Sequence, residues 1–132
     1  MTTTAEHTEA LDLAARWIDA LTAKDFDRIG ELLDPDARLR GLVPGNVRDE
    51  SGRDASVNRL RVWYGDVDRL EVLQSELEEF EGIVRFRNRV RGVDPDLGWT
   101  TFEQAGFVRT ADGLITSIDL VCSGDRPIPP PD

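Results

Sequence analysis

The stretch Ile83-Val-Arg-Phe-Arg-Asn-Arg-Val-Arg-Gly-Val93 places an arginine at every second position from 85 to 91. Phe86, Asn88 and Val90 stand between the arginines. A period of two is that of a β-strand, whose successive side chains point to opposite faces. We therefore predict a strand with a charged face and an apolar face, and Asn88 belongs to the apolar one.

The same period continues on both sides of this stretch. Residues 70–80, 99–109 and 114–122 are further predicted strands, with tight turns near 81–82 and 111–113. Acidic residues lie on or beside the strand that precedes the arginines, at positions 71, 76, 78, 79 and 81. Antiparallel pairing of residues 70–80 with 83–93 then sets acids opposite bases, which explains the arginine stripe without an anionic partner.

The first half of the chain carries helix signals. Apolar residues recur at spacings of three and four between residues 10 and 21, and Thr3 and Glu6 resemble a capping box before them. A short helix is predicted after Asp25, a strand at 37–42, a loop that opens at 44–45 and a third helix from about 51 to 64. The order of helix, helix, strand, helix and four strands predicts the α+β class with an antiparallel sheet.

Length and composition indicate one domain in a chain of 132 residues. We expect this domain to span residues 1–126 and a proline-rich tail to span 127–132. No apolar stretch is long enough for a transmembrane helix, and the first residues lack the pattern of a signal peptide. We therefore expect a cytoplasmic protein that does not bind membranes.

Charge and metal-ligand content restrict the partners. Acidic residues number 26 and basic residues 16, giving a net charge of −10 that repels nucleic acid and anionic membranes. The single cysteine, Cys122, cannot form an internal disulfide. The single histidine, His7, lies in an N-terminus that we expect to fray, so a zinc or redox-metal site is disfavoured. We predict no metal and no cofactor.

Four segments, taken in order, resemble the nuclear-transport-factor-2-like (NTF2-like) superfamily and, within it, the SnoaL-like proteins. They are Arg16-Trp-Ile-Asp-Ala-Leu-Thr-Ala-Lys-Asp-Phe-Asp27, Leu33-Asp-Pro-Asp-Ala37, Gly52-Arg-Asp-Ala55 and Asp112-Gly-Leu-Ile115. The segments 63–66 and 120–125 also resemble a set of bacterial members. The resemblance implies a cone, in which three N-terminal helices pack in a strongly curved antiparallel sheet around a hydrophobic pocket.

The superfamily implied by this resemblance includes steroid isomerases, dehydratases, polyketide cyclases and epoxide hydrolases, as well as binding and dimerisation modules. Many members dimerise through the convex face of the sheet, so we expect a homodimer through that face. The fold alone does not decide among these functions.

The catalytic positions of two such enzyme groups are not retained. Those of the steroid isomerases match Trp17, Gly41 and Ala105. Those of the limonene-type epoxide hydrolases match a set in which only Asn88 is polar: Leu39, Gly41, Asn88, Val90 and Leu120. Proton transfer needs a positioned base and a donor for the developing oxyanion, so neither reaction is expected.

Glu103 is the candidate catalytic residue. If Trp99 and Phe107 point into the pocket, the period of two takes Thr101 and Glu103 with them. A carboxylate among apolar side chains has a raised pKa, which suits a general acid or base. The alternative is a glutamate at the rim of the cone, hydrated or paired with an arginine.

The candidate ligand-binding residues are Trp17, Tyr64, Asn88, Thr101 and Cys122. Each has a structural alternative, because aromatic residues at helical spacing and a lone cysteine are commonly core residues and Asn88 could satisfy a buried backbone group.

Two functions remain open at the level of sequence. One is a cofactor-free isomerase, dehydratase, cyclase or hydrolase that acts on a hydrophobic substrate by acid–base chemistry. The other is a non-catalytic ligand-binding or dimerisation module. The enzyme requires Glu103 in a cavity on the order of 300 Å³ or more, whereas the module predicts a smaller cavity filled by Trp17, Trp99 and Phe107.

Overall fold

The computed structural model describes residues 2–131, with side chains from Glu9 to Pro131. Over this range the helices are α1 (Thr2–Thr22), α2 (Phe26–Leu32) and α3 (Arg53–Tyr64). The strands are β1 (Leu33–Val43), β2 (Asn46–Ser51), β3 (Asp68–Phe80), β4 (Ile83–Asp94), β5 (Gly98–Ala111), β6 (Leu114–Cys122) and β7 (Arg126–Pro127). The side chains of Thr3, Glu6 and His7 lie outside those described.

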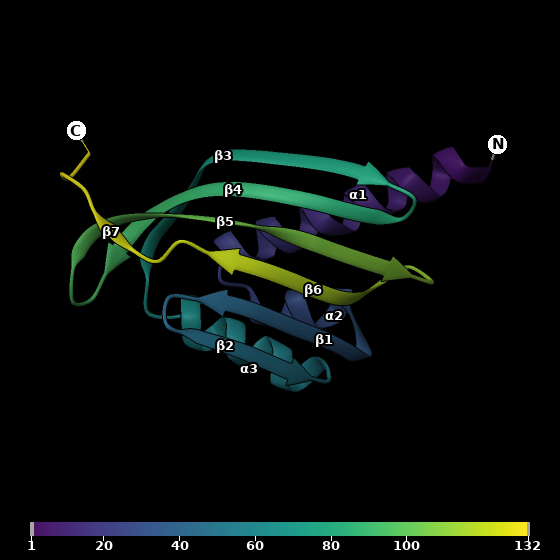
Figure 1. Cartoon of the computed structure of the whole chain (residues 1–132), viewed down its shortest axis with the longest axis horizontal. Coiled ribbons are helices and arrows are strands. Elements are labelled where there is room, and N and C mark those ends of the chain that lie inside the picture. The colour runs from purple at the N-terminus through teal and green to yellow at the C-terminus, as the bar shows by residue number, and fades with distance from the viewer. Residues whose placement is uncertain (1, 132) are drawn as a thin grey trace.

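The strands form one sheet in the order β2-β1-β6-β5-β4-β3, with β7 beside β5, and the helices lie against one face of it (Figure 1). This arrangement of three helices against one seven-stranded sheet confirms the predicted α+β class and agrees with the cone that the resemblance implies. We call the face that contacts the helices the inner face and the opposite one the outer face.

The prediction of a wholly antiparallel sheet is wrong at one pair. Strands β1 and β6 run parallel, with Leu39 opposite Ile118, while the other paired strands are antiparallel. Only strands joined by a hairpin must run antiparallel. The chain between β1 and β6 contains a helix and four strands, so no hairpin dictates their direction.

Two short strands were not predicted. Pro44 and Gly45 form a tight turn instead of opening a loop, with Gly45 at φ +75°, and β2 returns along β1. At the other end β7 pairs Arg126 with Thr101 and Pro127 with Thr100. The predicted boundary between domain and tail at residue 127 therefore falls within a strand.

The helices begin and end where local chemistry dictates. Asp25 caps α2, because its carboxylate accepts a hydrogen bond from the backbone N–H of Arg28 at 3.1 Å. Leu33 follows α2 in an extended conformation and begins β1 directly. None of the described helices combines the length and apolar character needed to cross a bilayer.

The core lies between the inner face and the helices. Trp17 of α1 is completely buried, and its ring meets that of Phe86 edge to face at a centroid distance of 5.2 Å. On β4 the buried residues Val84, Phe86, Asn88 and Val90 alternate with outward arginines, as the sequence predicts. The tryptophan thus fills the middle of the cone.

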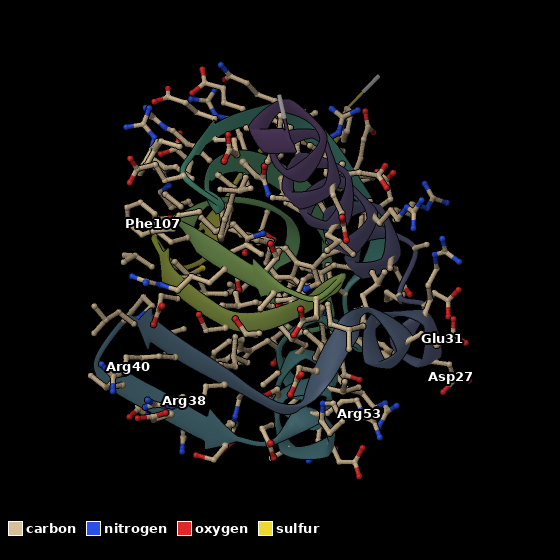
Figure 2. All side chains as sticks on the ribbon, turned by 90° about the vertical axis from the view of Figure 1, so that its right-hand side faces the viewer. Asp27, Glu31, Arg38, Arg40, Arg53 and Phe107 are labelled. Carbon is tan, nitrogen blue, oxygen red and sulfur yellow. The ribbon has the colours of Figure 1, made fainter. Side chains whose placement is uncertain are left out.

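The outer face carries the expected pairs of opposite charge. Arg85 contacts Glu78 at 2.8 Å and Arg91 contacts Glu71 at 3.0 Å, so acids do lie opposite bases. Such exposed pairs contribute only about 0–1 kcal/mol each. In Figure 2, Phe107 and Arg40 project from the sheet on the side away from the helices.

Candidate functional site

A cavity of about 220 Å³ lies at one end of the cone, and we call it the mouth cavity. Its walls come from the end of α3, the turn between β1 and β2, the strands β5 and β6, and the segment that joins β6 to β7. The lining residues are Val43, Pro44, Trp63, Tyr64, Val67, Phe102, Leu120, Cys122, Gly124 and Asp125. Most of these side chains are apolar or aromatic, which is typical of a site for a small organic molecule.

The last turn of α3 places two aromatic rings at the mouth cavity. Leu60 and Tyr64 lie on the buried side of this helix, one turn apart, and Trp63 is partly buried beside them. The helix ends at Tyr64 and is capped by Gly65, whose N–H donates to the carbonyl of Arg61 at 2.8 Å. The N–H of Val67 then donates back to the carbonyl of Tyr64 at 3.1 Å. Both rings are therefore held by a defined helix end.

The position of the Trp63 ring depends on a glycine, Gly41, on the neighbouring strand β1. A Cβ atom added to Gly41 of β1 would lie only 2.5 Å from Cη2 of the Trp63 ring. Glycine at position 41 thus makes room for the indole. Any larger residue there, a carboxylate included, would displace this wall of the mouth cavity.

A buried polar pair closes the inner end of the mouth cavity. The Tyr64 hydroxyl donates a short hydrogen bond to Oε1 of Gln104, which lies on the inner face of β5. Burial, and then the nearby Cys122 and Asp125, raise the pKa of Tyr64. The phenol therefore keeps its proton and acts as a neutral hydrogen-bond donor.

A second, much smaller cavity of about 10 Å³ lies behind this pair, and we call it the inner cavity. Tyr64 lines both cavities, whereas its partner Gln104 lines the inner one together with Asn88. Asn88 is 1% exposed; its Oδ1 accepts from Ser75 Oγ at 2.9 Å, whereas its Nδ2 has no hydrogen-bond partner among the described residues. The inner cavity is too small for a ligand as it stands.

The rim of the mouth cavity is formed by the segment 122–125. Gly124 has φ +84°, and a Cβ atom on it would lie 2.6 Å from Pro44 Cγ, so this segment packs closely on the β1–β2 turn. Burial raises the pKa of the Cys122 thiol, which disfavours the nucleophilic thiolate. Burial and the nearby Asp94 raise the pKa of Asp125.

The sequence profile of the SnoaL-like domain matches residues 14–118. The chain belongs to the SnoaL-like family. None of the curated proteins compared with it matches its sequence.

Solved structures of other proteins resemble this SnoaL-like chain. A candidate polyketide cyclase from Xanthomonas campestris pv. campestris has a TM-score of 0.74 and 21% identity over 88% of this chain and 91% of its own. An epoxide hydrolase from M. tuberculosis, described as LEH-like, has a TM-score of 0.71 and 21% identity over 89% and 85%.

A protein with a ketosteroid isomerase-like fold from Catenulispora acidiphila DSM 44928, in complex with trimethylamine, has a TM-score of 0.71 and 16% identity over 84% of this chain and 85% of its own. At these identities the three likenesses establish the fold.

The predicted position of Glu103 in this SnoaL-like protein is wrong. Phe102 and Gln104 face the helices, so Glu103 between them points to the outer face, where it contacts Arg89 at 3.0 Å. The hydrogen bond from Arg89 lowers the pKa of Glu103, opposite to the shift that a buried acid would show. Glu103 is thus the arginine-paired carboxylate that was the structural alternative.

The other predicted residues divide between three places. Tyr64 and Cys122 line the mouth cavity, and Asn88 lines the inner cavity. Thr101 lies on the outward side of β5, and its hydroxyl donates to the carbonyl of Val90 at 2.9 Å. Trp17 fills the core and lines neither cavity. The predicted ligand contacts of Thr101 and Trp17 are therefore corrected.

Ala105, which matches a catalytic position of the steroid isomerases, lies like Glu103 on the outward side of β5. Its side chain alternates with the inward Gln104 and faces outward, so the inner surface of β5 offers a neutral amide at this level. Trp99 and Phe107, expected to fill the pocket, also belong to the outward set. Within the described residues, no group of three or more His, Cys, Asp or Glu side chains is arranged to hold a metal ion.

Among the residues that sequence reasoning missed are Phe102 and Asp125 of the mouth cavity and Gln104 of the inner cavity. The signal for Gln104 was present in the hairpin of β4 and β5. Residues directly opposite each other in an antiparallel pair share a face, and Gln104 stands opposite the inward Asn88. The sequence offered no comparable signal for Asp125, because it follows the last predicted strand.

Proposed function

We propose that this SnoaL-like protein binds a small, mostly apolar molecule in the mouth cavity. The observation that carries the proposal is the buried Tyr64–Gln104 pair at the inner end of an open, aromatic-lined cavity. Apolar walls would hold the body of the ligand, and the phenol of Tyr64, fixed by Gln104, would orient one polar group. The similar proteins described as a polyketide cyclase, an epoxide hydrolase and a trimethylamine complex fit a small-molecule role.

The volume of the mouth cavity indicates the size of the ligand. Sites for drug-sized molecules occupy about 300–1,000 Å³, and an apolar cavity of about 150 Å³ accepts benzene. At about 220 Å³ the mouth cavity fits a molecule with a single ring or an equivalent short chain. A polycyclic substrate would require the core around Trp17 to open.

Binding without turnover is the favoured form of the proposal. Glu103 lies outside the cavity, and Tyr64 and Cys122 both hold their protons because burial raises their pKa values. Cofactor-independent acid–base catalysis is the second candidate, favoured by Asp125, a lining carboxyl group with a raised pKa. Retained turnover in an Asp125→Asn variant would remove that candidate.

A cavity-filling pair of variants tests the proposal. Cys122→Phe places a ring in the mouth cavity, whereas Val62→Phe adds the same ring at an exposed position of α3. Benzyl alcohol titrated into ¹⁵N-labelled protein should shift amide signals of Phe102, Leu120 and Gly124 in the wild type and in Val62→Phe. Loss of these shifts in a folded Cys122→Phe protein is expected, and unchanged shifts there would refute the site.

We also propose that two copies associate through the outer face. Val47, Phe107 and Val121 are exposed apolar residues on this face, at 58%, 40% and 53%, amid alternating acids and bases. Arg87 belongs to the same face and forms no ion pair within the described residues. A face that presents both charges and apolar side chains can complement a second copy of itself.

A further inference from the structure

The mouth cavity has one charged lining residue. Asp125 carries a carboxylate, and the other nine lining residues are neutral. No lysine or arginine is among the described residues that line the cavity. The site therefore presents a negative charge beside aromatic rings and offers no positive charge to an anionic ligand.

The carboxylate of Asp125 is held in place but has no polar partner in the part of the chain that the structure describes. The backbone N–H of Ser123 donates to the carbonyl of Glu103 at 2.9 Å, and β7 begins at Arg126, so β5 fixes the chain on both sides of Asp125. Gly124 packs on Pro44 between them. Within the described residues, Asp125 forms neither an ion pair nor a side-chain hydrogen bond.

The charges near the mouth cavity reinforce this negative field. Asp94, at the end of β4, is close enough to raise the pKa of Asp125. Lys24 is bound to the carbonyl of Val67 at 2.9 Å and lies 3.7 Å from Asp68. Arg126 acts on Glu103 at the outer face, where it helps to lower the pKa of that carboxyl. The charges of Lys24 and Arg126 thus act on these groups, and neither residue forms an ion pair with Asp125 within the described residues.

The aromatic walls suit a cation as well as an apolar body. Tyr64 and Phe102 stand with ring centroids 5.9 Å apart, and Trp63 lines the same cavity. Arg59 already lies over the Trp63 ring at 5.9 Å while it pairs with Glu50 at 3.4 Å. Ring faces attract cations, most strongly where water is excluded.

Resting on the proposed function, we infer that the ligand of the mouth cavity is a protonated amine with a small apolar body. Its ammonium group lies beside the carboxylate of Asp125, and its apolar body lies against Phe102 and Leu120. An ion pair at an exposed carboxylate such as that of Asp125 supplies modest affinity, so the charge acts chiefly through selectivity among ligands of equal size.

Three probes that share one ring separate charge from shape: benzylamine, benzyl alcohol and benzoate. Calorimetric titration at pH 7 and low salt should show benzylamine binding about fivefold or more tightly than benzyl alcohol, with benzoate the weakest. Asp125→Asn should reduce the affinity for benzylamine to that for benzyl alcohol and leave benzyl alcohol unchanged. Asp112→Asn, which removes the same charge at the distant β5–β6 turn, should retain the preference.

The outcomes of these titrations test the amine ligand separately from the proposal that the mouth cavity is a binding site. Equal binding of benzylamine and benzyl alcohol, tighter binding of benzoate, or an unaltered preference in Asp125→Asn would overturn the ligand class and leave the binding site standing. Failure of all three probes to bind the wild-type protein would overturn the proposed function together with the ligand class.

Discussion

Gly41 has no side chain, and the space this leaves shapes the wall of the mouth cavity. Gly41→Ala would bring a Cβ atom 2.5 Å from Cη2 and 3.2 Å from Cζ3 of Trp63, both in a large, stiff ring. We expect a loss of about 1–3 kcal/mol in the free energy of unfolding, as overpacking in a core causes. Urea unfolding followed by circular dichroism measures the change.

Gly30→Ala is the matched control for this substitution. Gly30 lies inside α2, and its added Cβ would meet Val57 Cγ2 at an ordinary 3.9 Å. Alanine in a helix interior is better than glycine by about 1 kcal/mol, so the control should gain stability. A neutral effect of Gly41→Ala would contradict the contact with Trp63.

Glu103 gives a prediction about pH with a definite sign. Arg89 lowers the pKa of Glu103 from its ordinary 4.5, so the folded state favours the ionised form. The stability gained from this pair is present above the unfolded pKa and is lost as pH falls through the folded one. The difference in unfolding free energy between wild type and Glu103→Gln should therefore be positive at pH 7 and decline as pH falls below the ordinary pKa of a glutamate.

Glu31→Gln is a suitable control for this measurement, because Glu31 is exposed on α2 and forms no ion pair within the described residues. Glu103→Gln should also leave the affinity for benzyl alcohol unchanged. A stability difference that persists at low pH, or weaker binding in Glu103→Gln, would show that the carboxylate does more than pair with Arg89.

Among the elements, β4 and β5 differ in how well their sequences define their faces. Arginine at every second position of β4 fixes its outward side, and the prediction of that face was confirmed. On β5 each face carries two large apolar residues, Phe102 and Val108 inward and Trp99 and Phe107 outward. The hydrophobic pattern alone could not show which face of β5 is the inner one, and a shift of one residue moves every side chain of a strand to the opposite face.

The charges of β4 held the information that β5 lacked. Glu103 stands directly opposite Arg89, and residues so paired project from the same face of a sheet. Since the arginines face outward, Glu103 must do so too. The prediction placed Glu103 on the wrong face because it rested on the hydrophobic pattern of β5 alone and not on the pairing of β5 with β4.

The cap of α2 yields a prediction at the level of a helix. Asp25→Ala removes the acceptor for the Arg28 N–H and should cost about 0.5–2 kcal/mol of unfolding free energy. Asp27→Ala, in the first turn of the same helix, removes a charge near the helix terminus without removing the cap and should cost less. Thermal unfolding of both variants compares them, and equal losses would contradict the capping role.

Across the whole molecule, the sequence predicted the class and most elements but not how the ends of the sheet are completed. The strand Leu114–Cys122 was predicted with its observed bounds, because alternation and flanking turns define it. Strand β2 is exposed along most of its length and has no buried alternation to reveal it. The short β7 exists through its pairing with β5, which only the assembled fold supplies.

Assembly supplies the last prediction. If two copies meet through the outer face, sedimentation equilibrium should give about twice the 14.8 kDa of one chain. Phe107→Glu places a charge in the apolar part of that face, beside Asp119 on the neighbouring strand, and should shift the protein to monomers. Val62→Glu, at an exposed apolar residue of α3, should remain dimeric. A monomeric wild type at micromolar concentration would refute the dimer, because stable interfaces bury about 1,200 Å² or more and do not dissociate at that concentration.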